Sequence, residues 1–197
     1  IICISSKVPM KDISIIKSSI KDRDAILIGP SATGVFSPGK ALAGIFPVNK
    51  AIEGNLGVIS RVGALSYDVL QLLYENNIGV STAVGLGDNC MTGASFVDIL
   101  DLFEIDAHTD RILILGQPGN IQEELAASHI LESITKPVYA YIVGKSIDPE
   151  NIIGHTDMSM FDAQHRSLNK IQSLANSGVQ IANRIEELPL LLKNKAG

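Results

Sequence analysis

The feature that most constrains the fold of this chain is a regular alternation of short aliphatic and β-branched runs with longer amphipathic segments. The short runs predict buried strands, because a strand covered on both faces reads as a nearly continuous hydrophobic stretch. The amphipathic segments between them predict helices that cross over from one strand to the next. The sequence therefore predicts an α/β protein built on a parallel sheet.

The expected strands lie at residues 1–5, 25–28, 56–60, 82–86, 112–115, 138–143 and 179–181. The expected helices lie at residues 11–21, 64–76, 94–104, 121–134, 164–177 and 185–194. From Gly54 onward strand and helix alternate about five times, which is typical of a flavodoxin-like, doubly wound parallel sheet. We therefore expect residues 1–30 to be the tail of a Rossmann-type domain, residues 31–53 to be a linker without helical periodicity, and residues 54–197 to form the flavodoxin-like domain.

Composition and charge exclude several classes of function. The net charge is −5 and no Lys/Arg-rich run is present, so we expect no nucleic-acid partner. Cys3 and Cys90 lie far apart, and the four histidines lack metal-ligand spacing, so we expect neither a disulfide nor a metal site. No apolar run is long enough to span a bilayer, so we expect no membrane partner. Because the chain begins "IICISS" inside an expected strand, we expect it to be a piece of a longer protein.

Ligands of doubly wound sheets bind at the carboxyl ends of the strands, so the loops that follow the strands are the candidate site. In "SRVGALSYD" a strand ends and a helix begins near Gly63 and Ala64. Such a turn directs backbone N–H groups and the positive end of a helix dipole toward an anion such as phosphate or carboxylate. An ordinary turn capped by Ser60 or Ser66 explains the pattern equally well.

Two later loops carry further candidate features. In "GQPGNIQEE", Gly116 and Gly119 predict a turn, and Glu123 and Glu124 favour the start of a helix. His155 follows a glycine in "GHTD". It is either a nucleophile that carries a phosphoryl group or a polar residue of a surface loop, and its position alone leaves both open.

Taken together, the motifs resemble the α subunit of succinyl-CoA synthetase (succinate–CoA ligase, NDP-forming) and its relatives, including the matching part of ATP-citrate lyase. The motifs are "GPSATGVFSPGKALAGIFP", "GVISRVGALSYDVL", "GLGDNCMTGASFVDIL", "KPVYAYIVGK" and "GHTD…LANSGVQ". They occur in the family's order over essentially the whole chain. The amino-terminal part of the family's CoA-binding domain, including its glycine-rich loop, has no counterpart in this sequence.

The resemblance implies roles for individual residues. His155 falls on the phosphohistidine of the family's "GHAG" motif, and Tyr67 falls on the tyrosine of "SRSGTLTYE", which lies at the substrate site. Gly63 and Ala64 match the helix N-terminus that holds the phosphate. Gln117 stands where the family's "GEIGG" has a glutamate that orients the histidine. The CoA-contacting "ITEG" segment matches Ile4, Ser5 and Ser6.

The resemblance also implies the reaction and its participants. The substrates would be CoA and a small carboxylic acid, and the phosphoryl group would pass from an acyl phosphate through His155 to ADP or GDP. A β-type ATP-grasp subunit would be the partner and would bind ATP or GTP with Mg. The compartment would be the bacterial cytoplasm or the mitochondrial matrix.

Several site positions depart from the family and leave alternatives open. Val62 replaces the second serine of "SRSG", Gln117 replaces the glutamate, and "FDAQH" at residues 161–165 replaces the glycine-rich "AGGKG". One alternative is therefore a catalytically impaired paralogue that binds a β-type partner or CoA without phosphoryl transfer. Another is a CoA ligase for a different carboxylic acid.

Overall fold

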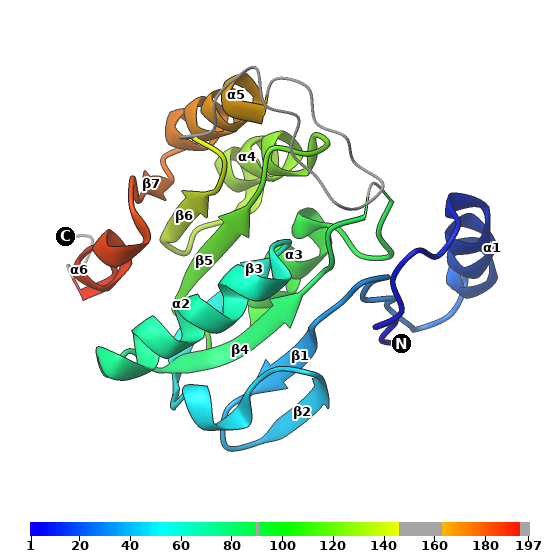
Figure 1. Cartoon of the computed structure of the whole chain (residues 1–197), viewed down its shortest axis with the longest axis horizontal. Helices are drawn as coiled ribbons and strands as arrows, with labels where there is room; N and C mark the ends of the chain where they lie inside the picture. Colours follow the sequence, from blue (N-terminus) through cyan, green and yellow to red (C-terminus); the bar gives the residue numbers. More distant parts are fainter. Residues whose placement is uncertain (90, 146–162, 194–197) are drawn as a thin grey trace.

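The computed structural model describes residues 1–89, 91–145 and 163–193, and within them the strands form one sheet flanked by helices (Figure 1). The spatial order of the strands is β2-β1-β4-β3-β5-β6-β7. Their bounds are Gly34–Ser37 (β1), Ala41–Gly44 (β2), Glu53–Ser60 (β3), Val80–Gly85 (β4), Arg111–Gly116 (β5), Val138–Ile142 (β6) and Gln180–Ile181 (β7). The strands β4, β3, β5, β6 and β7 run parallel to one another.

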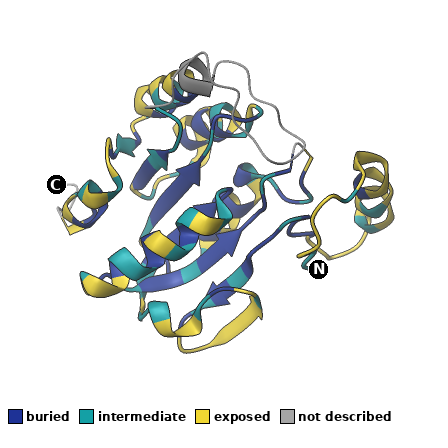
Figure 2. Cartoon of the chain, viewed as in Figure 1, coloured by how far each residue is buried: buried dark blue, intermediate teal, exposed yellow. Residues whose placement is uncertain are grey.

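Helices cover both faces of the parallel strands. The larger apolar cluster includes residues of α3 (Phe96–Ile105), α4 (Gln122–Ser133) and α5 (Ala163–Asn176). The cluster on the other face includes residues of α2 (Gly63–Glu75) and α6 (Leu188–Lys193). Short 3₁₀ turns occur at Val48–Lys50 and Ile185–Glu187. Figure 2 shows that the central strands are the most deeply buried part of the molecule.

The central strand β3 explains why the sheet is covered on both sides. Val58 packs into the α2/α6 cluster and the next residue, Ile59, packs into the α3/α4/α5 cluster, as the two-residue period of a strand requires. If the parallel strands are numbered in chain order, their spatial order across the sheet is 2-1-3-4-5, which is the flavodoxin-like order. The predicted α/β, flavodoxin-like fold class is confirmed.

Residues 31–53 differ from the expected linker. They contain the antiparallel hairpin β1–β2, and β1 also pairs antiparallel with β4, so the sheet is mixed and not wholly parallel. The hairpin depends on Gly34 and Gly44, where the two backbones touch. A Cβ on Gly34 would lie 2.1 Å from the Ala43 carbonyl oxygen, and a Cβ on Gly44 would lie 2.2 Å from the Thr33 carbonyl oxygen. Whether a domain boundary lies near residues 30 or 53 stays a prediction.

The amino-terminal strands are shorter than the sequence predicts. Residues 1–5 and 25–28 meet in a single parallel bridge between Ile2 and Ile28, where the Cys3 N–H also donates to the Ile28 carbonyl over 2.8 Å. Helix α1 (Met10–Ile20) joins these two segments and lies to one side of the sheet (Figure 1). None of the helices in the described ranges combines the length and the apolar content that crossing a bilayer requires.

Candidate functional site

The strand order leaves a crevice at the carboxyl ends of β3 and β5. These strands are neighbours, with Ser60 paired to Leu115, but the chain leaves β3 for α2 on one face and leaves β5 for α4 on the other. Loops that diverge in this way form the ligand-binding crevice of doubly wound sheets. A cavity of about 650 Å³ opens there. Its lining residues are Ile4, Ser6, Lys7, Ser31, Ala32, Thr33, Ile45, Arg61, Val62, Gly63, Ala64, Asp88, Asn89 and Gln117.

The cavity brings together several residues that the sequence places far apart. The predicted phosphate-binding turn, Gly63 and Ala64, faces the same space as Gln117 and as Ile4 and Ser6 of the predicted CoA-contacting segment. Ser5 adjoins this wall, where its carbonyl accepts a hydrogen bond from the Ser31 N–H over 3.0 Å.

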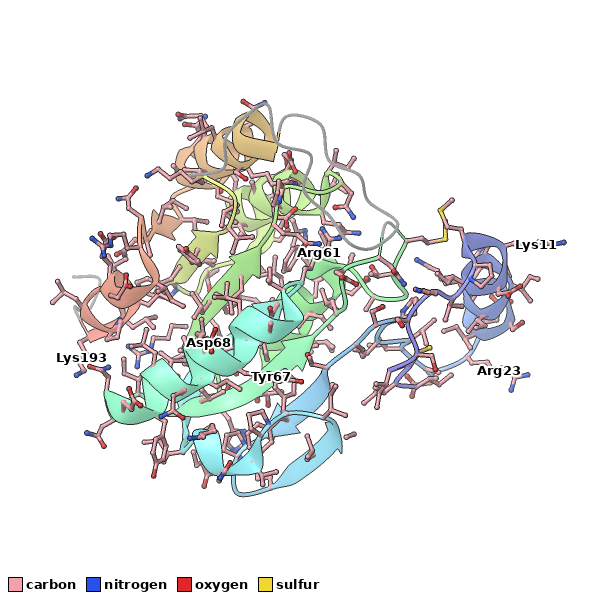
Figure 3. The ribbon with its side chains drawn as sticks, in the orientation of Figure 1. Lys11, Arg23, Arg61, Tyr67, Asp68 and Lys193 are labelled. Atoms are coloured by element: carbon pink, nitrogen blue, oxygen red, sulfur yellow. The ribbon has the colours of Figure 1, made fainter. Side chains whose placement is uncertain are left out.

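Of the predicted residues that the structure describes, Tyr67 and Ser5 are not among those that line the cavity. The Tyr67 hydroxyl lies 3.4 Å from the Ile45 carbonyl oxygen, and its ring packs edge-on against Phe46 with 6.2 Å between ring centroids. Tyr67 therefore lies behind the wall to which Ile45 belongs, on α2 and apart from Arg61 at the end of β3 (Figure 3). The predicted nucleophile, His155, lies outside the described residues. The roles of Tyr67 and His155 stay predictions.

The amino-terminal end of α2 has no side-chain cap. Its N-cap residue is Val62, whose side chain cannot accept a hydrogen bond. The Ser60 hydroxyl accepts a hydrogen bond from the Val62 N–H over 3.0 Å. The Ser66 hydroxyl lies 2.7 Å from the Ser60 hydroxyl and 2.8 Å from the Val62 carbonyl, so it does not cap the helix either. The positive end of the α2 dipole is thus directed at the cavity without a side-chain cap.

Arg61 is a buried cation in the wall of the crevice, with 1% of its surface exposed. It donates to the Asn120 side-chain oxygen over 2.8 Å and to the Asn89 carbonyl over 3.2 Å. Its other contacts are the Gly119 carbonyl at 3.5 Å and a Glu123 carboxylate oxygen at 3.7 Å. The guanidinium of Arg61 therefore contacts the loops that follow β4 and β5.

Glu123 and Lys170 extend this buried charge behind the crevice. Both side chains are fully buried, and the Lys170 ammonium lies 2.6 Å from one Glu123 oxygen. Lys170 also donates to the Asn120 carbonyl over 2.6 Å and to Glu124 over 2.7 Å. The other Glu123 oxygen accepts from the Gln117 N–H over 3.0 Å.

The sequence analysis did not identify Arg61, Glu123 or Lys170 as site residues, but a signal for two of them exists. Glu123 occupies the first position of an i, i+3, i+4, i+7 stripe whose other members are the buried Ala126, Ala127 and Ile130. Lys170 occupies the same kind of stripe in α5, with Ser167, Ile171 and Leu174. A charge inside an inward-facing stripe indicates a buried ion pair.

Hydrogen-bonding capacity remains in the cavity wall. The Asn89 side-chain nitrogen and the Thr33 hydroxyl are buried and have no hydrogen-bond partner among the described residues. The Thr33 hydroxyl lies against Gly85, where an added Cβ would come within 1.5 Å of it. Within the same part of the chain, no group of three or more His, Cys, Asp or Glu side chains could hold a metal ion. The uncommitted donors suit an oxygen-bearing ligand.

The chain is similar to known proteins over most of its length. Residues 53–191 match the family described as the succinyl-CoA ligase like flavodoxin domain. The chain is 34% identical to succinate–CoA ligase (ADP-forming) subunit alpha 1 of Archaeoglobus fulgidus, over 94% of this chain and 63% of that protein. It is 33% identical to the alpha subunit of Aquifex aeolicus, over 92% of this chain and 60% of that protein. The chain thus spans less than two thirds of the length of these relatives.

Solved structures share the fold at lower identity. ATP citrate lyase from Methanothrix soehngenii, in complex with citrate and coenzyme A, superposes with a TM-score of 0.82 at 20% identity, over 98% of this chain and 33% of that one. The dinucleotide-forming acetyl-coenzyme A synthetase 1 of Ca. Korarchaeum cryptofilum gives a TM-score of 0.70 at 20% identity, over 95% of this chain and 41% of that one. The matched domain and the relatives show that the chain belongs to the family of succinate–CoA ligase α subunits.

Proposed function

We propose that the chain acts as the α-type subunit of an NDP-forming acyl-CoA ligase whose substrates are succinate and CoA. The observation that carries this proposal is the crevice between β3 and β5, where the uncapped start of α2 and Gln117 line the same cavity as Ile4 and Ser6. The named activity of the relatives from Archaeoglobus fulgidus and Aquifex aeolicus supports the choice of substrates.

The proposed reaction has three steps, in which an acyl phosphate forms and its phosphoryl group is then transferred twice. Inorganic phosphate attacks the thioester carbonyl, the C–S bond breaks, CoA leaves as the thiolate, and an acyl phosphate forms. A ring nitrogen of His155 then attacks phosphorus, the P–O bond to the acyl group breaks, and the carboxylate leaves. The β-type partner subsequently passes the phosphoryl group to ADP or GDP with Mg. Such transfers depend on positioning and on fixed dipoles more than on covalent help from the protein.

The chain's own residues suit these steps. The N–H groups at Gly63 and Ala64 and the α2 dipole would stabilise the charge on the transferred phosphoryl group. Gln117 would orient the imidazole of His155 through its carboxamide, and Tyr67 would contact the carboxylic acid from the partner side.

The amino-terminal segment suits coenzyme A. A second cavity of about 310 Å³ shares Lys7 and Asn89 with the crevice, and its remaining lining is Val8, Pro9, Met10, Ile13 and Met91. The apolar lining fits the uncharged arm of CoA, and Lys7 fits an anionic group beside it. Ile4, Ser5 and Ser6 would then hold the arm where it enters the crevice.

The experiment that tests the proposal uses the full-length protein with its candidate β partner and γ-labelled ATP. We expect acid-labile, base-stable label on the α chain that disappears in His155→Asn. The matched control is His108→Asn, because His108 is exposed and lies beside Asp106, away from the residues that line the crevice. Label that persists in His155→Asn would refute the assignment of the nucleophile.

The second candidate function is partner or CoA binding without phosphoryl transfer. It is favoured by Gln117, whose amide nitrogen lies 3.5 Å from the Asp88 carbonyl oxygen and which lacks the negative charge that would stabilise an imidazolium. The absence of label, with the partner active beside a standard α subunit, would support this function. Gln117→Glu should then restore label if the missing charge is the reason.

A further inference from the structure

Three charged side chains meet behind the crevice, where an apolar core would normally be expected. Arg61, Glu123 and Lys170 are 1%, 0% and 0% exposed. Charges so deeply buried lose their hydration, and well-packed apolar residues of similar volume usually support a fold as well or better. Their contacts therefore call for an explanation other than stability.

The contacts converge on backbone groups of the loops that line the crevice. Arg61 donates to the Asn89 carbonyl in the loop after β4, and it lies 3.5 Å from the Gly119 carbonyl in the loop after β5. Glu123 holds the N–H of Gln117 at 3.0 Å, and Lys170 holds the Asn120 carbonyl at 2.6 Å. Each of the three charged side chains thus bonds a backbone N–H or C=O group that an apolar side chain could not bond.

The network also connects elements that enter the site from different directions. Arg61 directly follows β3, Glu123 belongs to the first turn of α4, and Lys170 belongs to α5, which begins at Ala163. With Glu124, two positive and two negative groups meet, so the cluster is balanced. Opposite charges and hydrogen bonds within such a cluster offset the cost of burial and resist displacement.

Gly116 leaves the room that the cluster needs. A Cβ at this position would lie 2.9 Å from both Cγ and Oε1 of Glu123. The carboxylate therefore lies directly on the backbone at the end of β5, next to the N–H of Gln117 that it accepts from.

We propose that Arg61, Glu123 and Lys170 are positioning residues that hold the loops 61–64 and 117–120 in the geometry required for phosphoryl transfer. This proposal deepens the proposed function and rests on it for its catalytic consequence. The three residues act through the loops: Glu123 and Lys170 do not line the cavity, and Arg61 lines it with its guanidinium engaged by Asn89 and Asn120.

The decisive variant removes one charge of each sign. Glu123→Gln combined with Lys170→Met keeps the side-chain size and the charge balance, so the fold should survive. The matched control makes the same two chemical changes elsewhere, in Glu104→Gln with Lys136→Met. Glu104 accepts from the Lys136 N–H, and the Lys136 ammonium donates to the Phe103 and Asp106 carbonyls, away from the residues that line the crevice.

The first measurement is amide hydrogen exchange in the full-length protein. We expect the amides of residues 61–64 and 117–120 to exchange faster by about 10-fold or more in the Glu123/Lys170 variant, while those of β3 and β5 keep their wild-type rates. The control pair should leave the loop amides unchanged. If the double variant fails to fold by circular dichroism, Glu123→Gln alone replaces it, because it removes the charge that strengthens the hydrogen bond from the Gln117 N–H with the smallest change of shape.

The second measurement is the rate at which the partner phosphorylates the chain. Loops displaced by about 1 Å should slow phosphorylation by about 100-fold without changing the KM for ATP, which the partner binds. With Lys170→Arg in place of Lys170→Met, part of the phosphorylation rate should return.

Wild-type exchange in the loops would overturn the proposal, and so would faster exchange with an unchanged phosphorylation rate. If the wild-type chain takes no label at all, the proposed function fails, and the exchange result still decides whether the network holds the loops.

Discussion

Gly116→Ala is the most informative single substitution, because it adds one methyl group at the junction of β5 with the crevice. The new Cβ would lie 2.6 Å from Cδ1 of Ile142 and 2.9 Å from Cγ and Oε1 of Glu123. Carbon atoms pack at about 3.5–4.0 Å, so the Ile142 contact is about 1 Å too short. Ile142 is buried in the α3/α4/α5 cluster and cannot move without displacing its neighbours.

The cost follows from these two contacts. Overpacking of this kind destabilises a core by about 1–3 kcal/mol. Displacing Glu123 also weakens its charge-assisted hydrogen bond to the Gln117 N–H, and a bond of this type contributes about 1.5–3 kcal/mol. A combined loss of about 3 kcal/mol should lower Tm by roughly 6–12 °C for a chain of this size.

Calorimetry of the variant and two companions tests this prediction. Gly178→Ala is the control, because Gly178 has φ +86° but no atom within 4 Å of an added Cβ, so only backbone strain of about 1–2 kcal/mol remains. Ile142→Val removes the Cδ1 atom, so in the Gly116→Ala background it should recover part of the lost stability. A Gly116→Ala protein that melts within about 2 °C of wild type would refute the argument.

Three further predictions concern single elements. Val62→Ser places a hydroxyl at the N-cap of α2, which has no side-chain cap, and should raise the free energy of unfolding by about 1 kcal/mol in a urea titration. Ser95→Ala removes the capping box of α3, in which Ser95 and Asp98 bond reciprocally, and should lower the same free energy by about 1 kcal/mol, whereas Ser95→Thr, which keeps the hydroxyl, should not. Burial by itself raises the pKa of Glu104, but the hydroxyl and N–H of Thr135, the N–H of Lys136 and the Lys136 charge together hold the pKa below its usual value. The stability from ionised Glu104 is therefore fully present above the unfolded-state pKa of about 4.3 and lost as pH falls through the lower folded-state pKa. Wild type and Glu104→Gln should therefore differ in stability at pH 7 and converge once the pH is below the folded-state pKa.

The parallel core could be predicted from the sequence because its signals are local. The strand around Val58 and Ile59 is a continuous apolar run, and the helices beside it carry clear apolar stripes. The hairpin β1–β2 could not be predicted from the sequence. Each of its strands has only four residues, and Ala41, Leu42 and Ala43 are all exposed. The edge strand β2 therefore shows no alternation of burial, and what defines the hairpin is the close backbone contact at Gly34 and Gly44.

The residues of the candidate site also differ in whether the sequence could predict their positions. Gly63, Ala64 and Gln117 could be located because they directly follow strands whose carboxyl ends meet at the same edge. The position of Tyr67 behind Ile45 could not, because it depends on where the segment that follows the hairpin, with Ile45 and Phe46, meets α2. Sequence periodicity reports which face of an element is buried but not which loop covers it.

The buried charges show why the crevice of this chain needs its own scaffold. Its walls come from loops separated by more than fifty residues, Arg61 and Gln117 among them, and loop backbone has no ladder of its own to fix it. Apolar packing would bury these loops but would leave their N–H and C=O groups unpaired, at a cost of about 1–3 kcal/mol each. Arg61, Glu123 and Lys170 satisfy four such groups at once: the carbonyls of Asn89, Gly119 and Asn120 and the N–H of Gln117. In a site built from loops, buried charges can therefore hold backbone groups that apolar packing would leave unpaired.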